Sequence, residues 1–446
     1  MLHQKLFSQA NRLALVFVLL SASVCMKHAS AAECRLPATA VESSGAAAPT
    51  ASAWTGRLYL DVSTSMAGFA AGDQHQLLAD LLSYLPGTIR EAGAEAVATH
   101  FVGTEIVPVA EKQFAGAGQA AVFKQPGLSR RGQIGKPVTA ALDAPAGDLT
   151  VVVTDLFLDD ANLPTIGASP LALPLRKALD RKLAVGILGI RVPFSGTIYD
   201  LPGKTSSIRF KGERPLFLLM VGPAERIRSM IAHVRRDLLD GRDDAMRFVM
   251  FARPAAGVTL DAAAAGRQGG AEELRRLPLR IEAPPPAFRL PRGGAGSISV
   301  PIGMPERMAP GMPGLVLHGE RTVVHVTPED DCRWREVKLR TGDLVTLSED
   351  GRSLVLFGAP DARRGLPPGL LHVAVTLTAK PQADPGLEAA LAGWSVSTAE
   401  APALAAKPPA FFPALNLARL ATRLSEAASE GEPVPAGDLA VLLSLE

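Results

Sequence analysis

Residues 149–154 constrain the fold more than any other segment of this chain. They read Leu-Thr-Val-Val-Val-Thr, an unbroken run that predicts a strand buried on both faces, as in a parallel sheet. Further strands of the same sheet are expected at residues 58–61, 183–190 and 216–221. Amphipathic helices are expected at residues 74–90, 171–182 and 224–239. This alternation predicts an α/β fold with a doubly wound, mostly parallel sheet and helices on both faces.

Oxygen-bearing side chains come directly after two of these strands. Asp61, Ser63 and Ser65 occupy alternate positions at the end of the first strand, and Asp155 ends the run VVVTD. In an open α/β sheet, ligands bind outside the carboxyl ends of the strands. A hard cation such as Mg²⁺ takes oxygen ligands but only one or two carboxylates, which suits one aspartate beside two hydroxyls. The alternative is structural, because Ser63 or Ser65 could simply cap the helix that follows.

The pattern Asp61-x-Ser63-x-Ser65, with Asp155 after a central strand, resembles the metal-ion-dependent adhesion site of von Willebrand factor type A domains. The resemblance extends over about residues 55–239. It implies a Rossmann-like domain in which these four side chains hold Mg²⁺, with Ca²⁺ or Mn²⁺ as alternatives. It also implies that the ion binds an acidic group of a protein partner, in adhesion or assembly at the cell envelope.

The chain departs from this family at the third metal ligand, which is normally a threonine. Gln133 stands where the threonine is due, Ser129 is a nearby substitute, and Thr139 lies too far into the next helix. Arg130 and Arg131 would lie beside the site, where they could repel a cation or pair with an acidic partner. The occupancy of the metal site is therefore left open by the sequence.

The N-terminus and the cysteines indicate export. Basic residues precede a short apolar run, and Ala31 ends a small-x-small pattern, so we expect a signal peptide over residues 1–31 and a secreted or periplasmic protein. An uncleaved N-terminal anchor is the alternative, and no membrane span is expected in the mature chain. Cleavage leaves Cys34 and Cys332, which are expected to form a disulfide in an oxidising compartment, with two free thiols as the alternative.

The rest of the chain differs from the α/β region in its composition and in the spacing of its apolar residues. Within the α/β region, residues 191–213 are expected to form an irregular insertion. In the C-terminal segment, helices are expected at residues 415–425 and 439–445. Short β-like runs separated by turns predict a β-sandwich-like domain. The expected organisation is a flexible lead-in (32–53), an α/β domain (54–253), a linker (254–295), a β-rich domain (296–400) and a C-terminal helical segment (401–446).

Charge and motifs exclude several classes of function. The formal net charge is +2 with both signs interspersed, so no nucleic-acid partner is indicated. The sequence has no Gly-rich phosphate loop in the right context, no H-E-x-x-H and no G-x-S-x-G. The histidines occur singly and are expected to be surface or packing residues, and Arg235 and Arg236 are expected on the solvated face of a helix.

Three functional hypotheses follow. The first is a non-enzymatic, exported interaction protein that binds an acidic group of a protein partner through a divalent ion. The second is a metal-independent scaffold subunit of an envelope assembly, which the missing threonine favours. The third is a metal-assisted hydrolase using Asp61 and Asp155, which lacks a positioned base in the sequence.

Overall fold

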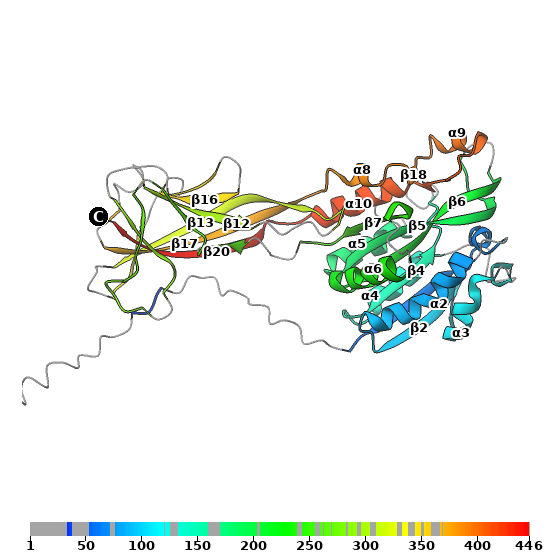
Figure 1. Ribbon diagram of the computed structural model, residues 1–446, viewed down its shortest axis with the longest axis horizontal. Helices are drawn as coiled ribbons and strands as arrows, with labels where there is room; N and C mark the ends of the chain where they lie inside the picture. The colour runs from blue at the N-terminus through cyan, green and yellow to red at the C-terminus, as the bar shows by residue number, and fades with distance from the viewer. Residues whose placement is uncertain are drawn as a thin grey trace, which may run out of the picture.

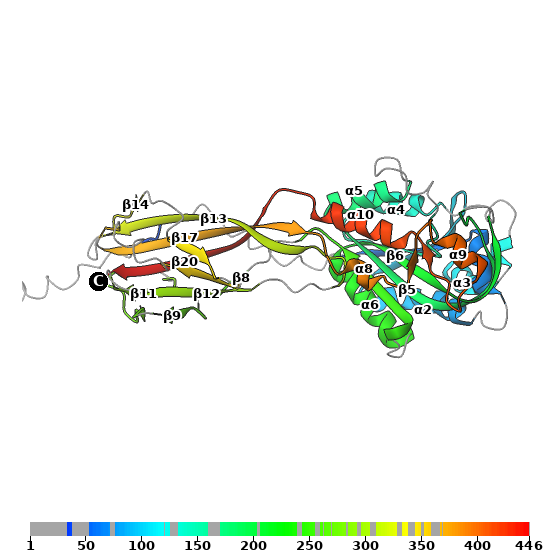
Figure 2. The same ribbon diagram turned by 90° about the horizontal axis from the view of Figure 1, so that it is seen from above.

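The protein is elongated, with an α/β domain at one end and a β-rich domain at the other (Figures 1 and 2). The C-terminus lies at the β-rich end. The computed structural model describes residues 34–37, 53–71, 76–119, 121–124, 133–158, 170–202, 206–238, 243–254, 259–261, 263–268, 270–281, 284–291, 296–303, 309–327, 332–337, 344–348, 352–357, 366–367 and 369–445. Within these residues, no helix combines the length and the apolar character needed to cross a lipid bilayer.

A seven-stranded mixed sheet forms the centre of the α/β domain. Its order is β3-β2-β1-β4-β6-β5-β7, with β1 parallel to β2 and β4, and every other neighbouring pair antiparallel. The strands are β1 (Thr55–Asp61), β2 (Ala96–Val102), β3 (Ile106–Val109), β4 (Leu149–Thr154), β5 (Ala184–Ile198), β6 (Ile208–Gly222) and β7 (Met246–Phe251). The expected α/β class is confirmed, but the prediction of a mostly parallel sheet was wrong. A hairpin joins β5 to β6 where a crossover helix would be needed for parallel pairing.

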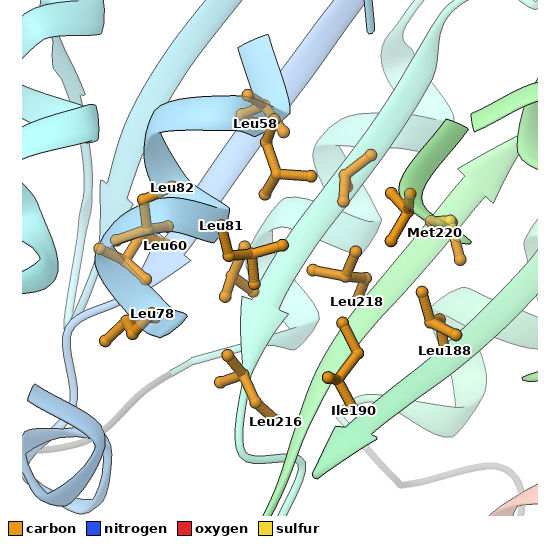
Figure 3. Packing of buried hydrophobic residues seen from close by; sticks show 14 of the residues in the cluster. Leu58, Leu60, Leu78, Leu81, Leu82, Leu188, Ile190, Leu216, Leu218 and Met220 are labelled. Carbon is orange, nitrogen blue, oxygen red and sulfur yellow. The ribbon is translucent and has the colours of Figure 1, made fainter. Parts of the chain in front are cut away.

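Helices cover both faces of this sheet. Helices α2 and α6 share one apolar core with the leucines of β1 and the centre of β6 (Figure 3). Helices α4, α5 and α10 share a second core with the opposite face. The helices are α2 (Gln76–Glu91), α3 (Glu111–Ala115), α4 (Gly135–Asp143), α5 (Ala172–Asp180), α6 (Ala224–Leu238) and α10 (Leu417–Ser429). Their buried residues recur every three or four positions, as an amphipathic helix requires.

The expected irregular insertion at residues 191–213 is instead the outer half of the β5–β6 hairpin, which continues regular pairing as far as Ile198 and Ile208. Its Phe194 side chain is buried against the 3₁₀ helix η1 (Thr64–Ala70). Gly68 of η1 makes this approach possible, since a Cβ atom there would lie 2.2 Å from the Phe194 ring. Tertiary packing on η1 therefore orders a segment whose prolines and glycines resemble a loop.

The β-rich domain consists of two sheets that share one core. One sheet has the order β10-β11-β20-β17-β13-β14; the other has the order β15-β16-β12-β8, with β9 also pairing with β12. The strands are β8 (Thr259–Leu260), β9 (Gly266–Gln268), β10 (Glu272–Glu273), β11 (Ala287–Leu290), β12 (Ser297–Gly303), β13 (Gly314–Thr327), β14 (Arg335–Val337), β15 (Val345–Leu347), β16 (Ser353–Leu356), β17 (Leu370–Gln382) and β20 (Val434–Leu445). The expected linker (254–295) thus supplies strands β8 to β11. The prediction of a helix at residues 439–445 was wrong, because this run belongs to β20.

The chain returns to the α/β domain before it ends. After β17 it forms α8 (Leu387–Ala390), β18 (Ser395–Val396), α9 (Ala401–Ala406) and β19 (Ala414–Leu415), followed by α10. It then crosses back to the β-rich domain as β20, which pairs with β17 and β11.

The expected pairing of Cys34 with Cys332 is confirmed. The two residues form a disulfide with Cα atoms 5.2 Å apart and a sequence separation of 298. The backbone N–H of Cys34 also donates to the Arg280 carbonyl at 2.8 Å. The N-terminal segment is therefore held on the β-rich domain by a covalent bond and a backbone hydrogen bond.

Candidate functional site

Strands β1 and β4 bring the two predicted polar loops together. They are parallel neighbours, with Leu60 opposite Val153, so Asp61 and Thr154 end the strands side by side. The Thr154 hydroxyl donates to Asp61 Oδ2 at 2.9 Å, and the Ser63 backbone N–H donates to Asp61 Oδ1 at 2.9 Å. Both Asp61 oxygens therefore have fixed donors, and Asp155 follows directly after Thr154.

The two serine hydroxyls lie next to each other. Ser63 Oγ and Ser65 Oγ are 3.0 Å apart. Two ligands of one octahedral Mg²⁺ at 2.0–2.1 Å would be separated by about 3.0 Å. Ser63 is the N-cap residue of η1, yet its side chain makes no capping hydrogen bond. The capping interpretation of Ser63 is therefore unsupported, and the spacing of the hydroxyls is that of two neighbouring cation ligands.

A buried arginine that the sequence analysis did not identify lies at this site. Arg214 of β6 is completely buried, and its Nη1 atom lies 3.5 Å from Asp155 Oδ2. Its guanidinium also lies over three aromatic rings, at 4.8 Å from Phe194, 5.2 Å from Phe157 and 5.8 Å from Phe69. Among the described residues, Nε and Nη2 of Arg214 have no hydrogen-bond partner.

Buried charges of both signs determine the electrostatics of the site. Burial, and then the charge of Asp155, raise the pKa of Asp61 to about 6. Burial lowers the pKa of Arg214, and the attraction of Asp155 opposes that shift. Arg214 supplies one positive charge against two carboxylates, so one negative charge is left when both aspartates are ionised.

The third metal ligand is not supplied by the residues that the structure describes around α4. Thr139 uses its hydroxyl within its own helix, where it donates to the Gly135 carbonyl at 2.9 Å. Gln133 is exposed, and its backbone N–H donates to the Gly103 carbonyl at 3.3 Å. Ser129, Arg130 and Arg131 lie outside the described residues.

The loop after Asp155 is held by the C-terminal part of the chain. Asn416 stands at the start of α10 with φ 57°, a left-handed conformation that asparagine adopts more readily than most residues. Its Nδ2 atom donates to the Leu158 carbonyl at 3.0 Å in a buried position. The backbone of Phe412 also pairs with Glu213, next to Arg214, by donating to its carbonyl at 2.9 Å.

These observations test whether the site suits a divalent cation. The hydroxyl pair fits, because its spacing is that of two cation ligands. The carboxylates fit poorly, because Asp155 already faces the buried positive charge of Arg214. Asp61, Ser63 and Asp155 are only 2–6% exposed, whereas a bound Mg²⁺ usually keeps several waters. As a whole, the donor set does not fit a complete adhesion-type metal site.

Searches against family models, curated proteins and solved structures found no match for this chain.

Proposed function

We propose that this chain is a metal-independent interaction protein, a scaffold subunit of an exported or envelope assembly. The proposal rests on Arg214, a buried cation paired with Asp155, which is one of the four side chains that the family resemblance assigns to a metal ion. A guanidinium fixed by three aromatic rings and a carboxylate is a permanent part of the core. The carboxyl edge of the sheet would then be stabilised internally and would keep one shape with or without divalent ions.

Two further observations support a structural role in an exported protein. The Cys34–Cys332 disulfide agrees with an oxidising compartment. The elongated arrangement places the α/β domain at a distance from the end of the β-rich domain, as suits a subunit that bridges partners (Figure 1).

The experiment compares thermal unfolding of the whole protein in chelator and in millimolar Mg²⁺ or Mn²⁺, for wild type, Asp61→Ala and Asp143→Ala. Asp143 is an exposed carboxylate at the end of α4 and serves as the matched control. We expect the same melting temperature in chelator and in metal for all three proteins. A metal-dependent rise in wild type and Asp143→Ala that is lost in Asp61→Ala would overturn the proposal.

A second candidate is partner binding through a divalent ion, which one specific observation favours. The Ser63 and Ser65 hydroxyls, 3.0 Å apart, are spaced as cation ligands beside the Asp61 carboxylate. In this alternative, Ser63, Ser65 and Asp61 would hold the ion, and the ion would attract an acidic group of the partner. Capture of a protein from an envelope extract by the immobilised chain in Mg²⁺, but not in chelator, is the result that this alternative requires.

A further inference from the structure

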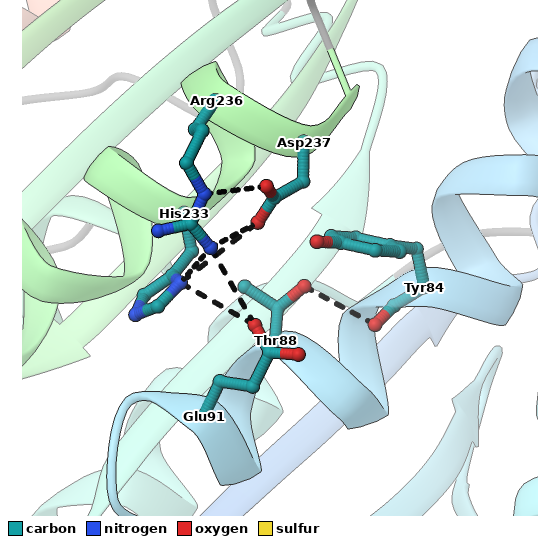
Figure 4. A network of polar contacts seen from close by, with 6 residues as sticks. All are labelled: Tyr84, Thr88, Glu91, His233, Arg236 and Asp237. Carbon is teal, nitrogen blue, oxygen red and sulfur yellow. Dashed lines mark hydrogen bonds and ion pairs between the residues drawn. The ribbon is translucent and has the colours of Figure 1, made fainter.

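A histidine and two carboxylates converge between helices α2 and α6. Glu91 is the last residue of α2, and His233 and Asp237 lie one turn apart on α6 (Figure 4). The Nδ1 atom of His233 lies 3.4 Å from Glu91 Oε2 and 3.8 Å from Asp237 Oδ2. Ligand atoms of the three residues all lie within 4.8 Å of one another. Spacing of i and i+4 places the α6 pair on one face, and packing of the two helices adds Glu91.

The distances between these atoms resemble those in a zinc site. Zinc binds nitrogen and oxygen ligands at 2.0–2.2 Å, so neighbouring ligands of a tetrahedral ion are about 3.4 Å apart. The His233–Glu91 distance already has this value, and the His233–Asp237 distance is slightly longer. The Glu91 and Asp237 oxygens lie within 4.8 Å of each other, so rotation of the two carboxylates toward the ion would complete three corners of a tetrahedron.

The hydrogen bonds show which atom of His233 faces the cluster. Nη2 of Arg236 lies 2.8 Å from His233 Nδ1. An arginine can only donate, so Nδ1 accepts this bond and presents a lone pair rather than a proton. A nitrogen lone pair and two carboxylates thus face one another, an arrangement that is favourable only around a positive charge.

Arg236 supplies that charge, and it is the most exposed member of the cluster. Its guanidinium bonds Asp237 at 2.5 and 2.6 Å and lies 3.7 Å from Glu91, yet its side chain is 62% exposed. Exposed ion pairs of this kind contribute only about 0–1 kcal/mol, so the arginine can move into solvent at low cost. His233 and Asp237 have side chains only 20% and 21% exposed and would stay in place.

We propose that Glu91, His233 and Asp237 form a transition-metal site that takes Zn²⁺ in place of the Arg236 guanidinium. An imidazole nitrogen favours Zn²⁺ over Mg²⁺ and Ca²⁺, which prefer sites made only of oxygen. Three protein ligands leave a fourth position for water. The ion would link α2 to α6 and stabilise the α/β domain when zinc is present, which departs from the expectation that the single histidines are not zinc ligands.

Calorimetric titration of the whole, metal-stripped protein with Zn²⁺ tests the site, with Mg²⁺ as the comparison ion. We expect about one equivalent of Zn²⁺ to bind, and His233→Ala to weaken binding by at least about tenfold because it removes one of three ligands. Arg236→Ala is expected to tighten binding, since it removes the competing cation. Glu225→Gln and Arg228→Ala remove exposed charges elsewhere on α6 and are the controls.

Absorption of the Co²⁺-loaded protein provides a second measurement that does not depend on stability. Intense visible bands in wild type that are absent in His233→Ala would support a tetrahedral site with a histidine ligand. Unchanged zinc affinity in His233→Ala would overturn the proposal, because the ion would then bind elsewhere. Two results with Arg236→Ala would also overturn the proposal. Weaker zinc binding than in wild type would show that Arg236 does not compete with the ion. Zinc binding by this variant but not by wild type would show that the native protein does not form the site.

Discussion

Replacing Asp61 with asparagine tests the electrostatics of the candidate site most directly. Burial, and then Asp155, raise the pKa of Asp61 from 3.8 to about 6 in the folded protein. Because the folded-state pKa lies above the unfolded one, the folded state holds the proton more tightly. Protonated, neutral Asp61 therefore does not reduce the unfolding free energy at low pH. The unfolding free energy falls as pH rises from about 4 through about 6 and Asp61 ionises. A rise of the pKa from 3.8 to about 6 corresponds to a loss of about 3 kcal/mol of unfolding free energy at neutral pH, relative to pH values well below 3.8.

Asparagine cannot ionise, yet it keeps the shape and the contacts of Asp61. Its amide oxygen can accept from the Ser63 N–H, and its amide nitrogen can donate to the Thr154 hydroxyl. Both proteins are unfolded with denaturant in chelator at about pH 4 and about pH 7.5. Tryptophan fluorescence follows unfolding, since Trp54 and Trp394 are buried in the α/β domain and Trp334 packs in the β-rich domain. We expect wild type to lose about 2 kcal/mol more than Asp61→Asn between these pH values, because part of the total loss has already occurred at about pH 4, where the unfolded carboxyl is partly ionised. Equal losses, or a larger loss in the variant, would refute this account of the site.

Three further substitutions test the surroundings of the site and the covalent link. Arg214→Met is expected to lower the unfolding free energy by about 3–5 kcal/mol, because it leaves the buried Asp155 carboxylate without its cation. Adding Asp155→Asn should recover most of this loss in denaturant titrations, and a double variant no better than the single one would contradict the pairing. Gly68→Ala is expected to cost about 1–3 kcal/mol by displacing Phe194, which circular dichroism melts will detect as a lower melting temperature. Cys332→Ser opens the long covalent loop and is expected to lower stability by at most about 5 kcal/mol in the same melts, and an unchanged melting temperature would show that the disulfide does not constrain the unfolded chain.

Much of the α/β domain could be predicted because its signals are local. The buried run of β4 and the apolar stripe of α2 depend only on the spacing of neighbouring side chains. The direction of β6 could not be predicted in this way, because it depends on how β5 is connected to it. Residues 191–213 contain prolines and glycines that are typical of loops, and their regular pairing depends on packing against η1.

The candidate site shows the same division between local and tertiary information. Asp61 and Asp155 could be located because each follows a recognisable strand, and the β1–β4 pairing brings those strand ends together. Arg214 could not be located, because the three rings around it come from η1, the loop after β4 and the β5–β6 hairpin. Arg214 lies between the expected irregular insertion (191–213) and the expected strand (216–221), and a charged side chain at such a position carries no sequence signal of burial. A buried cation of this kind is visible only after the elements are assembled.

The end of the chain illustrates a limit of periodicity. Residues 439–445 are apolar and short, and such a run fits a helix or a strand equally well. These residues form a strand because β20 pairs with β17 and β11. Both partner strands are distant in sequence, so the spacing of apolar residues within the run could not reveal the pairing.

The path of the chain determines how the proposed functions can be studied. After β7 the chain enters the β-rich domain, and residues 387–429 return to the α/β domain before β20, so neither domain is a continuous segment. Truncation before Asn416 would remove its hydrogen bond to Leu158, beside the candidate site, and would also remove β20 from within a sheet of the β-rich domain. A deletion would therefore disturb both domains at once, and its loss of binding could not be assigned to either. Point substitutions in the whole chain, such as Asp61→Asn and His233→Ala, change one group at a time and are the experiments that the topology allows.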